Sequence, residues 1–324
     1  MVYRKTICGN VILIAFISIF VFSTLSAQSG KIETAYTVKE KDLIPEGITY
    51  DINENAFYVG SIHKRKIVKI DSKGNVSNFI SEKEDGIFNV LGMKADSKRR
   101  ILWVCSYAGG GFVEERGFAG IFKYNLKNGK LIKKYLLDNK TSKHLFNDIV
   151  ITSAGDAYFT DTDTGIIYSI DHKVDSMEVF ISAGQFDHPN GIALSPDEKS
   201  IYIADNKGLH RTDIKGVVKE LKHPDSMATG GIDGLYFYKN SLVAVQNDFD
   251  PQRIVRYALN KNLDEIEKTD ILCQDNPLVF IPTTGVIVGD FFYIIGNSQL
   301  HLRKDGKITD YEKLEDVRIV KIKL

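Results

Sequence analysis

Residues 188–206 read HPNGIALSPDEKSIYIADN, and this stretch decides the fold. It holds an Asn-Gly pair, a short apolar run, a polar turn and a second apolar run. Two short apolar runs separated by turn residues are typical of a β-hairpin. The Asn190-Gly191 pair stands ahead of the first strand instead of between the two strands. The other copies of this hairpin explain that position.

The hairpin recurs along the chain. Its clear copies start at Glu46, Asn147, Asn190 and Asp233, and its weaker copies start at Leu91 and Thr284. Successive copies start about 40–55 residues apart, which is the length of a β-propeller blade of four short strands. Segments with helical periodicity are almost absent. The sequence therefore predicts an all-β fold, a six-bladed β-propeller.

The two ends of the chain predict how the ring closes. The last blade finishes with RIVKIKL and leaves no residues for a fourth strand, while IETAYTV (32–38) has no other partner. We expect this N-terminal strand to complete the last blade, because that pairing covers two exposed sheet edges at once. The prediction is a single propeller domain over residues 28–324.

Residues 1–27 differ in composition from the rest of the chain. They combine two basic residues, Arg4 and Lys5, with a long apolar run and a closing Ser26-Ala27 pair. This order is typical of a secretory signal peptide. An uncleaved membrane anchor is the alternative, but the apolar run is shorter than the roughly 20 residues that span a bilayer. We therefore expect cleavage after Ala27, no stable membrane span after cleavage, and export to the periplasm or the medium.

Charge and cysteine content narrow the possible functions. The chain carries 42 basic and 42 acidic residues, so its global charge does not favour binding to nucleic acid or to an anionic membrane. After signal removal the remaining cysteines are Cys105 and Cys273. They are too few for a disulfide framework and form no Cys-x-x-Cys metal or redox motif. The sequence leaves open whether they are bonded or free.

One position recurs at the entry to every innermost strand. Innermost strands line the central channel, so the six side chains at this position point toward one mouth of the ring. We call them the slot residues, and in chain order they are Glu46, Leu91, Asn147, Asn190, Asp233 and Thr284. Asn-Gly and Asp-Gly are common turn pairs, but turn residues favour exposed hairpin tips. Their recurrence at a crowded, inward-facing position predicts a site.

Four slot residues would bring two carboxylates and two amides to one point. The like charges would repel and lie partly desolvated unless a cation sat between them. All four side chains offer oxygen, which favours a hard divalent cation over zinc, copper or iron. Calcium accepts about 6–8 oxygen ligands in loose geometry, so we expect Ca²⁺, with other divalent ions as alternatives. The predicted ligands are Glu46, Asn147, Asn190 and Asp233.

The motifs around these residues resemble those of the SMP-30/gluconolactonase family of calcium-dependent six-bladed propellers. They are PEGITYD, FNDIVI, PNGIALSPD and GIDGLYF, and the resemblance extends over essentially the whole chain after residue 27. It implies that the four predicted ligands bind a catalytic calcium and that Asp233 acts as general base or nucleophile. The implied function is hydrolysis of a small lactone or ester, with calcium polarising the carbonyl group.

The sequence departs from the family pattern near the predicted site. Sugar-lactone hydrolases of the family often carry an arginine two residues before the first asparagine, where this chain has Leu145. The histidine of paraoxonase-type relatives would fall near Tyr107. Together with Leu91, His144 and Thr284, these residues predict a small-molecule pocket that is more apolar than a sugar site.

A non-catalytic propeller is the alternative function. It would bind a small ligand or a protein partner, and the same four residues would hold a structural calcium. The fold alone does not decide between the two functions. A catalytic metal keeps exchangeable water in an accessible pocket, whereas a structural metal is enclosed by protein oxygens.

Overall fold

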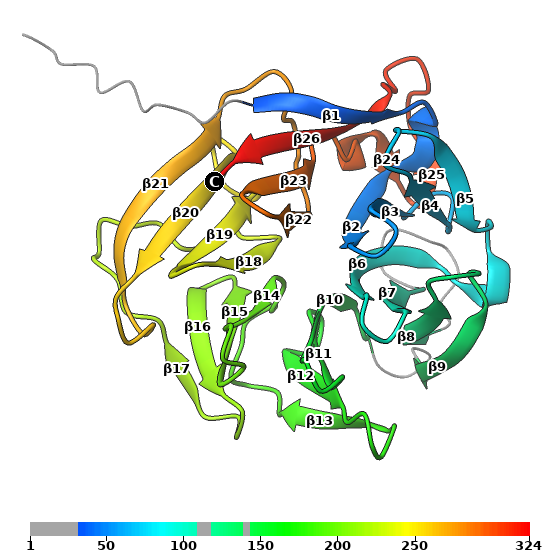
Figure 1. Ribbon diagram of the computed structural model, residues 1–324. Helices are drawn as coiled ribbons and strands as arrows, with labels where there is room; N and C mark the ends of the chain where they lie inside the picture. Colours follow the sequence, from blue (N-terminus) through cyan, green and yellow to red (C-terminus); the bar gives the residue numbers. More distant parts are fainter. Residues whose placement is uncertain (1–31, 109–117, 139–142) are drawn as a thin grey trace, which may run out of the picture.

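The structure is a computed structural model that describes residues 32–108, 118–138 and 143–324. Its strands form six four-stranded sheets around a central channel (Figure 1). The innermost strands of neighbouring sheets contact one another all around the ring. The predicted six-bladed propeller is therefore confirmed. The predicted signal peptide, residues 1–27, lies outside the described residues.

The strands of each blade follow one another in the sheet from the channel outward. Blade 1 consists of β2 (Pro45–Asp51), β3 (Ala56–Ser61), β4 (Ile67–Ile70) and β5 (Val76–Ile80). Blade 2 consists of β6 (Asn89–Asp96), β7 (Ile101–Tyr107), β8 (Phe118–Asn125) and β9 (Leu131–Asp138). Blade 3 consists of β10 (Phe146–Ile151), β11 (Ala157–Asp161), β12 (Ile166–Ile170) and β13 (Met177–Ile181). Blade 4 consists of β14 (Ile192–Leu194), β15 (Ser200–Asp205), β16 (Gly208–Asp213) and β17 (Val218–Glu220). Blade 5 consists of β18 (Leu235–Tyr238), β19 (Ser241–Gln246), β20 (Arg253–Leu259) and β21 (Ile266–Gln274). Blade 6 consists of β22 (Gly285–Val288), β23 (Phe291–Ile295), β26 (Val317–Lys323) and β1 (Ile32–Val38).

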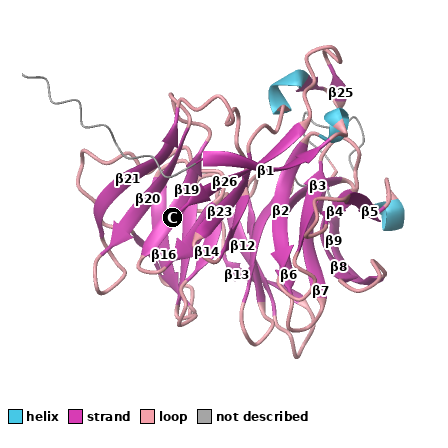
Figure 2. Ribbon diagram, turned by 45° about the horizontal axis from the view of Figure 1, so that its top comes forward, coloured by secondary structure: helices cyan, strands magenta, loops and turns pink. Residues whose placement is uncertain are grey.

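Helical structure among the described residues consists of single turns near the edge of the ring (Figure 2). These turns are η1 (Lys41–Leu43), η2 (Glu84–Gly86) and η4 (Leu300–Leu302). A small ribbon of β24 (Arg303–Lys304) and β25 (Lys307–Ile308) is inserted between β23 and β26. Among the described residues, no helix has the length and apolar character needed to cross a membrane.

The ring closes through the N-terminal strand, as the sequence predicts. Strand β1 pairs antiparallel with β26, with Ile32 opposite Ile322 and Val38 opposite Val317. Each of these two strands would otherwise present an unpaired sheet edge, so the pairing satisfies the backbone groups of both. The first and last described strands thus lie side by side in one blade (Figure 1).

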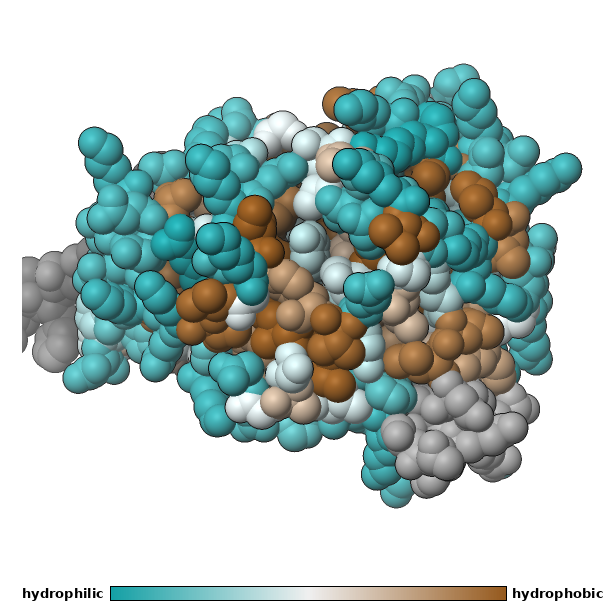
Figure 3. Space-filling model, turned by 90° about the horizontal axis from the view of Figure 1, so that it is seen from below, coloured by the Kyte–Doolittle hydropathy of each residue, from teal (hydrophilic) through white to brown (hydrophobic). Residues whose placement is uncertain are grey.

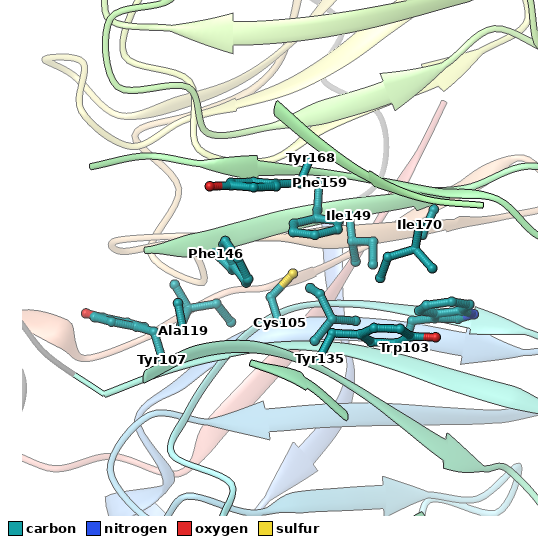
Figure 4. Close-up of a cluster of buried hydrophobic side chains, with 13 residues drawn as sticks. Trp103, Cys105, Tyr107, Ala119, Tyr135, Phe146, Ile149, Phe159, Tyr168 and Ile170 are labelled. Atoms are coloured by element: carbon teal, nitrogen blue, oxygen red, sulfur yellow. The ribbon is translucent and has the colours of Figure 1, made fainter. Parts of the chain in front are cut away.

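The blades pack face to face through apolar side chains. Between blades 2 and 3, Trp103 and Tyr135 on one side lie opposite Ile149 and Ile170 on the other (Figure 4). The rings of Phe146 and Phe159 lie 4.8 Å apart in an edge-to-face arrangement, which is a favourable geometry for aromatic pairs. Because both faces of the inner strands are covered, β15 is buried along its whole length.

The two cysteines in the described part of the chain lie in different blades. Cys105 is buried in the cluster between blades 2 and 3, with its sulfur directed between the two sheets (Figure 4). Cys273 is buried in β21 of blade 5. Both are free thiols in the structure, and burial raises the pKa of each above its usual value. A buried neutral thiol packs as a small apolar group.

Apolar residues are also present on the outer surface of the ring. In Figure 3 they form several small groups separated by hydrophilic residues. Large exposed apolar side chains in blades 3 and 4 are Val174, Val179, Ile214 and Val217. Single exposed apolar residues are normal for a soluble domain surface, so we assign these groups no role.

Asp175 connects blades 2 and 3 on their outer side. It lies in the turn between β12 and β13 and accepts hydrogen bonds from Lys133 Nζ at 2.6 Å, from Lys123 Nζ at 3.2 Å and from the Tyr135 hydroxyl. Partial burial alone would raise the pKa of Asp175, but these donors lower it to about 2. The ionised carboxylate therefore contributes to stability when the pH is above its unfolded-state pKa.

The variant Asp175→Asn should unfold more easily than the wild type at neutral pH. Because the side chain is 39% exposed, solvent screening limits the expected loss to about 1 kcal/mol. The folded pKa lies below the ordinary value of 3.8, so the difference between the two proteins should shrink as the pH falls from about 4 to about 2. Urea unfolding at several pH values measures it, with Asp225→Asn as the exposed control. A difference that stays constant with pH would contradict this role.

Candidate metal centre at the mouth of the channel

Backbones of neighbouring blades meet closely where the innermost strands begin. Glycine follows five of the six slot residues, and at three of these positions its missing side chain leaves room for the backbone of the next slot residue. A Cβ atom on Gly47, Gly92 or Gly191 would lie 1.9, 2.4 or 2.4 Å from the carbonyl oxygen of Leu91, Asn147 or Asp233, respectively. No ordinary side chain fits at such distances, so glycine is required. This packing explains why Asn190-Gly191 stands ahead of its strand.

Three slot residues share one site in the channel. The charge of Asp233 acts on Glu46, and the side-chain amide of Asn190 donates a hydrogen bond to Asp233. A further residue, Asn247, lies just after β19 and donates its Nδ2 to Asp233 Oδ2 at 2.6 Å. Glu46 and Asp233 are buried, and Asn190 is half-buried. Residues from blades 1, 4 and 5 therefore meet at one point.

Asn147 is tied to the same site through blade 4. Its Nδ2 donates to Thr162 Oγ1 at 3.1 Å, and the Thr162 hydroxyl donates to the carbonyl oxygen of Pro189 at 2.7 Å. Pro189 directly precedes Asn190. Because the amide nitrogen of Asn147 is engaged, its Oδ1 is the side-chain atom that remains for a ligand.

Burial raises the pKa of every carboxyl group in this part of the channel. The pKa of Glu46 is raised well above its usual value, first by burial and then by the charges of Asp233 and Asp148. Burial raises the pKa of Asp233 to about 6, although two asparagine side chains donate to it, and that of Asp148 to about 7. Such shifts arise where negative charge lacks compensation.

The donor atoms fit a hard cation. Among the described residues, Glu46 Oε2 and Asn190 Oδ1 are buried without a hydrogen-bond partner. A buried oxygen without a partner costs about 1–3 kcal/mol, and a bound cation would satisfy both. The four predicted ligands offer oxygen alone and carry two carboxylates, which suits a hard divalent ion.

Three of the predicted pocket residues belong to the hydrophobic packing between blades 2 and 3. Leu91 and Tyr107 are buried in that cluster, and Leu145 packs against it. Burial raises the pKa of the Tyr107 hydroxyl above its usual range. These side chains support the wall of the channel mouth.

The other two predicted pocket residues make specific hydrogen bonds. His144 is half-buried, and its Nδ1 lies 2.6 Å from Oδ2 of Asp161. Thr284 donates its hydroxyl to the backbone carbonyl of Glu46 at 2.5 Å and so fixes the backbone of that slot residue. Thr284 also lines a cavity further along the channel.

Sequence reasoning did not single out Thr162 and Asn247, which orient two of the slot residues. Both follow the second strand of their blade, at the exit of β11 and of β19. In an antiparallel pair the exit of the second strand lies beside the entry of the first. A polar residue at that repeat position was therefore the available signal.

The fold is shared with proteins of known structure. A gluconolactonase from Xanthomonas campestris is 13% identical, with a TM-score of 0.61 over 91% of each chain. A luciferin-regenerating enzyme is 14% identical, with a TM-score of 0.62 over 91% of this chain and 95% of that one. A chain of the nidogen/laminin complex is 13% identical, with a TM-score of 0.54 over 70% of this chain and 80% of that one. At such identities the likeness establishes the fold.

Sequence comparison gives information on the protein family in addition to the fold. No curated protein is significantly similar to it in sequence. The model of one family, described as SMP-30/Gluconolactonase/LRE-like region, matches residues 44–267. That range includes Glu46, Asn147, Asn190 and Asp233 and covers most of the ring. The chain belongs to the SMP-30/gluconolactonase/LRE-like family.

Proposed function

We propose that the protein is an exported, calcium-dependent hydrolase of a small lactone or ester. The observation that carries the proposal is the group of buried oxygens at the channel mouth, where Glu46 Oε2 and Asn190 Oδ1 have no hydrogen-bond partner in the described part of the chain and lie beside the Asp233 carboxylate. Membership of a family that includes gluconolactonases supports the reaction class.

The ion would be held by Glu46, Asn147, Asn190 and Asp233. Calcium suits them because it accepts carboxylate and amide oxygens in flexible geometry. An exported protein also meets enough calcium to fill a weak site. When bound, calcium would polarise the substrate carbonyl and stabilise the negative charge that develops on its oxygen.

Asp233 is the residue that would take a proton from the attacking water. Asn247 holds one oxygen of this carboxylate through a 2.6 Å hydrogen bond, so the carboxylate has a fixed orientation. Asn190 donates to the same group. A bound cation lowers the pKa of a carboxylate, which makes Asp233 a weak base whose contribution comes mainly from its position.

The substrate is expected to be less polar than a sugar lactone. Leu145 stands where sugar-lactone hydrolases of the family often have an arginine, and it packs in the apolar cluster between blades 2 and 3. The neighbouring Leu91 is also apolar and buried. Aliphatic lactones and simple aryl esters are therefore the first substrates to test.

A binding protein with a structural calcium is the second candidate. The structural likeness to a chain of the nidogen/laminin complex agrees with this role, because a propeller presents a rigid ring for recognition as well as for catalysis. In that case the ion would be enclosed and inert.

One experiment separates the two candidates. The purified protein is incubated with panels of lactones and aryl esters, with calcium added or after treatment with a chelator. The hydrolase proposal requires turnover that disappears with the chelator and returns with calcium. Calcium binding without hydrolysis of any member of the panels would favour the binding role.

The export part of the proposal has its own test. N-terminal sequencing of the mature protein from its native source should start at Gln28, directly after the predicted cleavage site. A mature protein that retains residues 1–27 would contradict it.

A further inference from the structure

A second cavity lies further along the channel than the candidate metal centre. Its volume is about 320 Å³, near the lower end of the range for ligand pockets, which is about 300–1,000 Å³. Its walls are formed by residues that follow the slot residues on the same innermost strands, such as Ile48 after Glu46 and Ile149 after Asn147. The cavity therefore opens toward the other mouth of the ring.

Most of the residues that line this cavity are apolar. They include Ile48, Ile149, Leu194, Phe237 and Ile287. Several of them, including Leu194, Phe237 and Ile287, are half-buried although they belong to the innermost strands. They offer a surface for the hydrocarbon part of a ligand.

Lys94 is the cationic group of the cavity. It is half-buried in β6, and burial lowers its pKa, whereas the charge of Asp148 acts in the opposite direction. Within the described part of the chain, Lys94 Nζ takes part in no hydrogen bond and no ion pair. By contrast, the buried Lys66 donates to both carboxylate oxygens of Glu40 at 2.8 and 2.9 Å.

The other polar groups of the cavity are already engaged. Thr49 Oγ1 accepts a hydrogen bond from the backbone of Ala95 at 3.0 Å, and the Tyr236 hydroxyl accepts one from Gly285 N at 2.6 Å. Asp148 accepts hydrogen bonds from the backbone N–H groups of Ile149 at 2.8 Å and Ile192 at 3.4 Å. Because Lys94 Nζ forms no hydrogen bond or ion pair within the described residues, its N–H groups are available to a ligand.

Asp148 separates this cavity from the candidate metal centre. Its charge acts on Glu46 on one side and on Lys94 on the other. Within the described residues, Lys94 is the one cationic side chain that lines this cavity, so a single carboxylate matches its charge and a polyanion is left with uncompensated charge. Phosphate and other polyanions are therefore disfavoured.

We propose that the cavity is a second ligand site, which binds a small monocarboxylate with an apolar tail. The carboxylate accepts hydrogen bonds from Lys94, and the tail lies against Ile149, Phe237 and Ile287. An ammonium that takes part in no hydrogen bond or ion pair within the described residues, and a lining of mostly apolar residues, together define this ligand chemistry. The site does not depend on the proposed hydrolase activity, because its residues are separate from the four predicted metal ligands.

Calorimetric titration with hexanoate tests the proposal on the full mature chain in the presence of a chelator. Hexanoate should bind, whereas hexan-1-ol, hexylamine and inorganic phosphate should bind at least about tenfold more weakly, because each lacks the charge or the tail that the cavity requires. The Lys94→Met variant keeps the length of the side chain without its charge, and it should weaken hexanoate binding at least about tenfold. The exposed Lys199→Met serves as the matched control and should leave binding unchanged.

A second variant keeps Lys94 and fills the cavity. Leu194→Trp should reduce hexanoate binding while near-ultraviolet circular dichroism confirms a native fold. The proposal is overturned if the wild type does not bind hexanoate, or if Lys94→Met binds it as tightly as the wild type. It is also overturned if binding occurs only with calcium present, because the carboxylate would then be a ligand of the metal centre.

Discussion

Replacing Asn190 with alanine is expected to abolish calcium binding and calcium-dependent hydrolysis while the propeller stays folded. The variant removes a buried amide oxygen that has no partner among the described residues and the amide that donates to Asp233. The backbone of Asn190 keeps its hydrogen bond from Thr160 Oγ1 at 2.8 Å. The change therefore acts on the site more than on the fold.

The expected loss of activity is large. Residues that only orient metal ligands already contribute about 10–100-fold to affinity or activity, so the loss of a ligand should exceed about 100-fold. Calcium content by elemental analysis and hydrolysis of the best substrate from the panels measure it. Asn240→Ala, in the exposed turn between β18 and β19, is the matched control. Calcium-dependent turnover at the wild-type rate in Asn190→Ala would rule out the proposed site.

The sequence was sufficient to predict the fold because each blade repeats one pattern. Alternating apolar residues in every second strand predict where the sheets are buried, and the phase of the repeat predicts the innermost strands. The ring closure was also predictable, since IETAYTV has the same bounds as β1 and no other segment was left to pair with β26. These inferences needed only local pattern and the rule that sheet edges are covered.

The surroundings of the site could be predicted only in part. The four predicted ligands lie at the same repeat position, and in the structure the charge of Asp233 acts on Glu46 while the amide of Asn190 acts on Asp233. The hydrogen-bond partners of these side chains depend on which loop lies beside each strand end in the fold. The residues next to a slot residue in the sequence do not contain this information. Thr162 and Asn247 were therefore missed. Leu91 and Tyr107, which are predicted to line the pocket, are buried where blade 2 packs against blade 3.

Lys94 illustrates a second limit of sequence reasoning. The sequence around it is Leu-Gly-Met-Lys-Ala-Asp. In a strand whose side chains alternate between two faces, this sequence predicts that the lysine points into solvent. In a propeller the innermost strands border the central channel, and this places the ammonium in a cavity that is lined mostly by apolar residues. The residues that surround Lys94 come from five other innermost strands, so its environment could not be inferred from the sequence of β6 alone.

The glycines that follow the slot residues should be the positions least tolerant of a larger side chain. A Cβ atom on Gly47 would lie 1.9 Å from the carbonyl oxygen of Leu91 and 2.9 Å from its carbonyl carbon. Both are backbone atoms of β6, so rotation of a side chain cannot relieve the overlap. The innermost strands of blades 1 and 2 would have to separate, and Glu46 would move with them.

Gly47→Ala should therefore lower the free energy of unfolding by about 3 kcal/mol or more, the upper end of the range for overpacked cores. Chemical unfolding of the metal-free protein measures the loss. Gly230→Ala is the matched control, because a Cβ atom there would meet only Asn206 O at 3.5 Å. This control should be neutral or more stable by up to about 1 kcal/mol, as expected when glycine is replaced without strain. If Gly47→Ala proves as stable as the control, the strands have more room than the structure shows. The close contact between blades would then not be what brings Glu46 to its place in the channel.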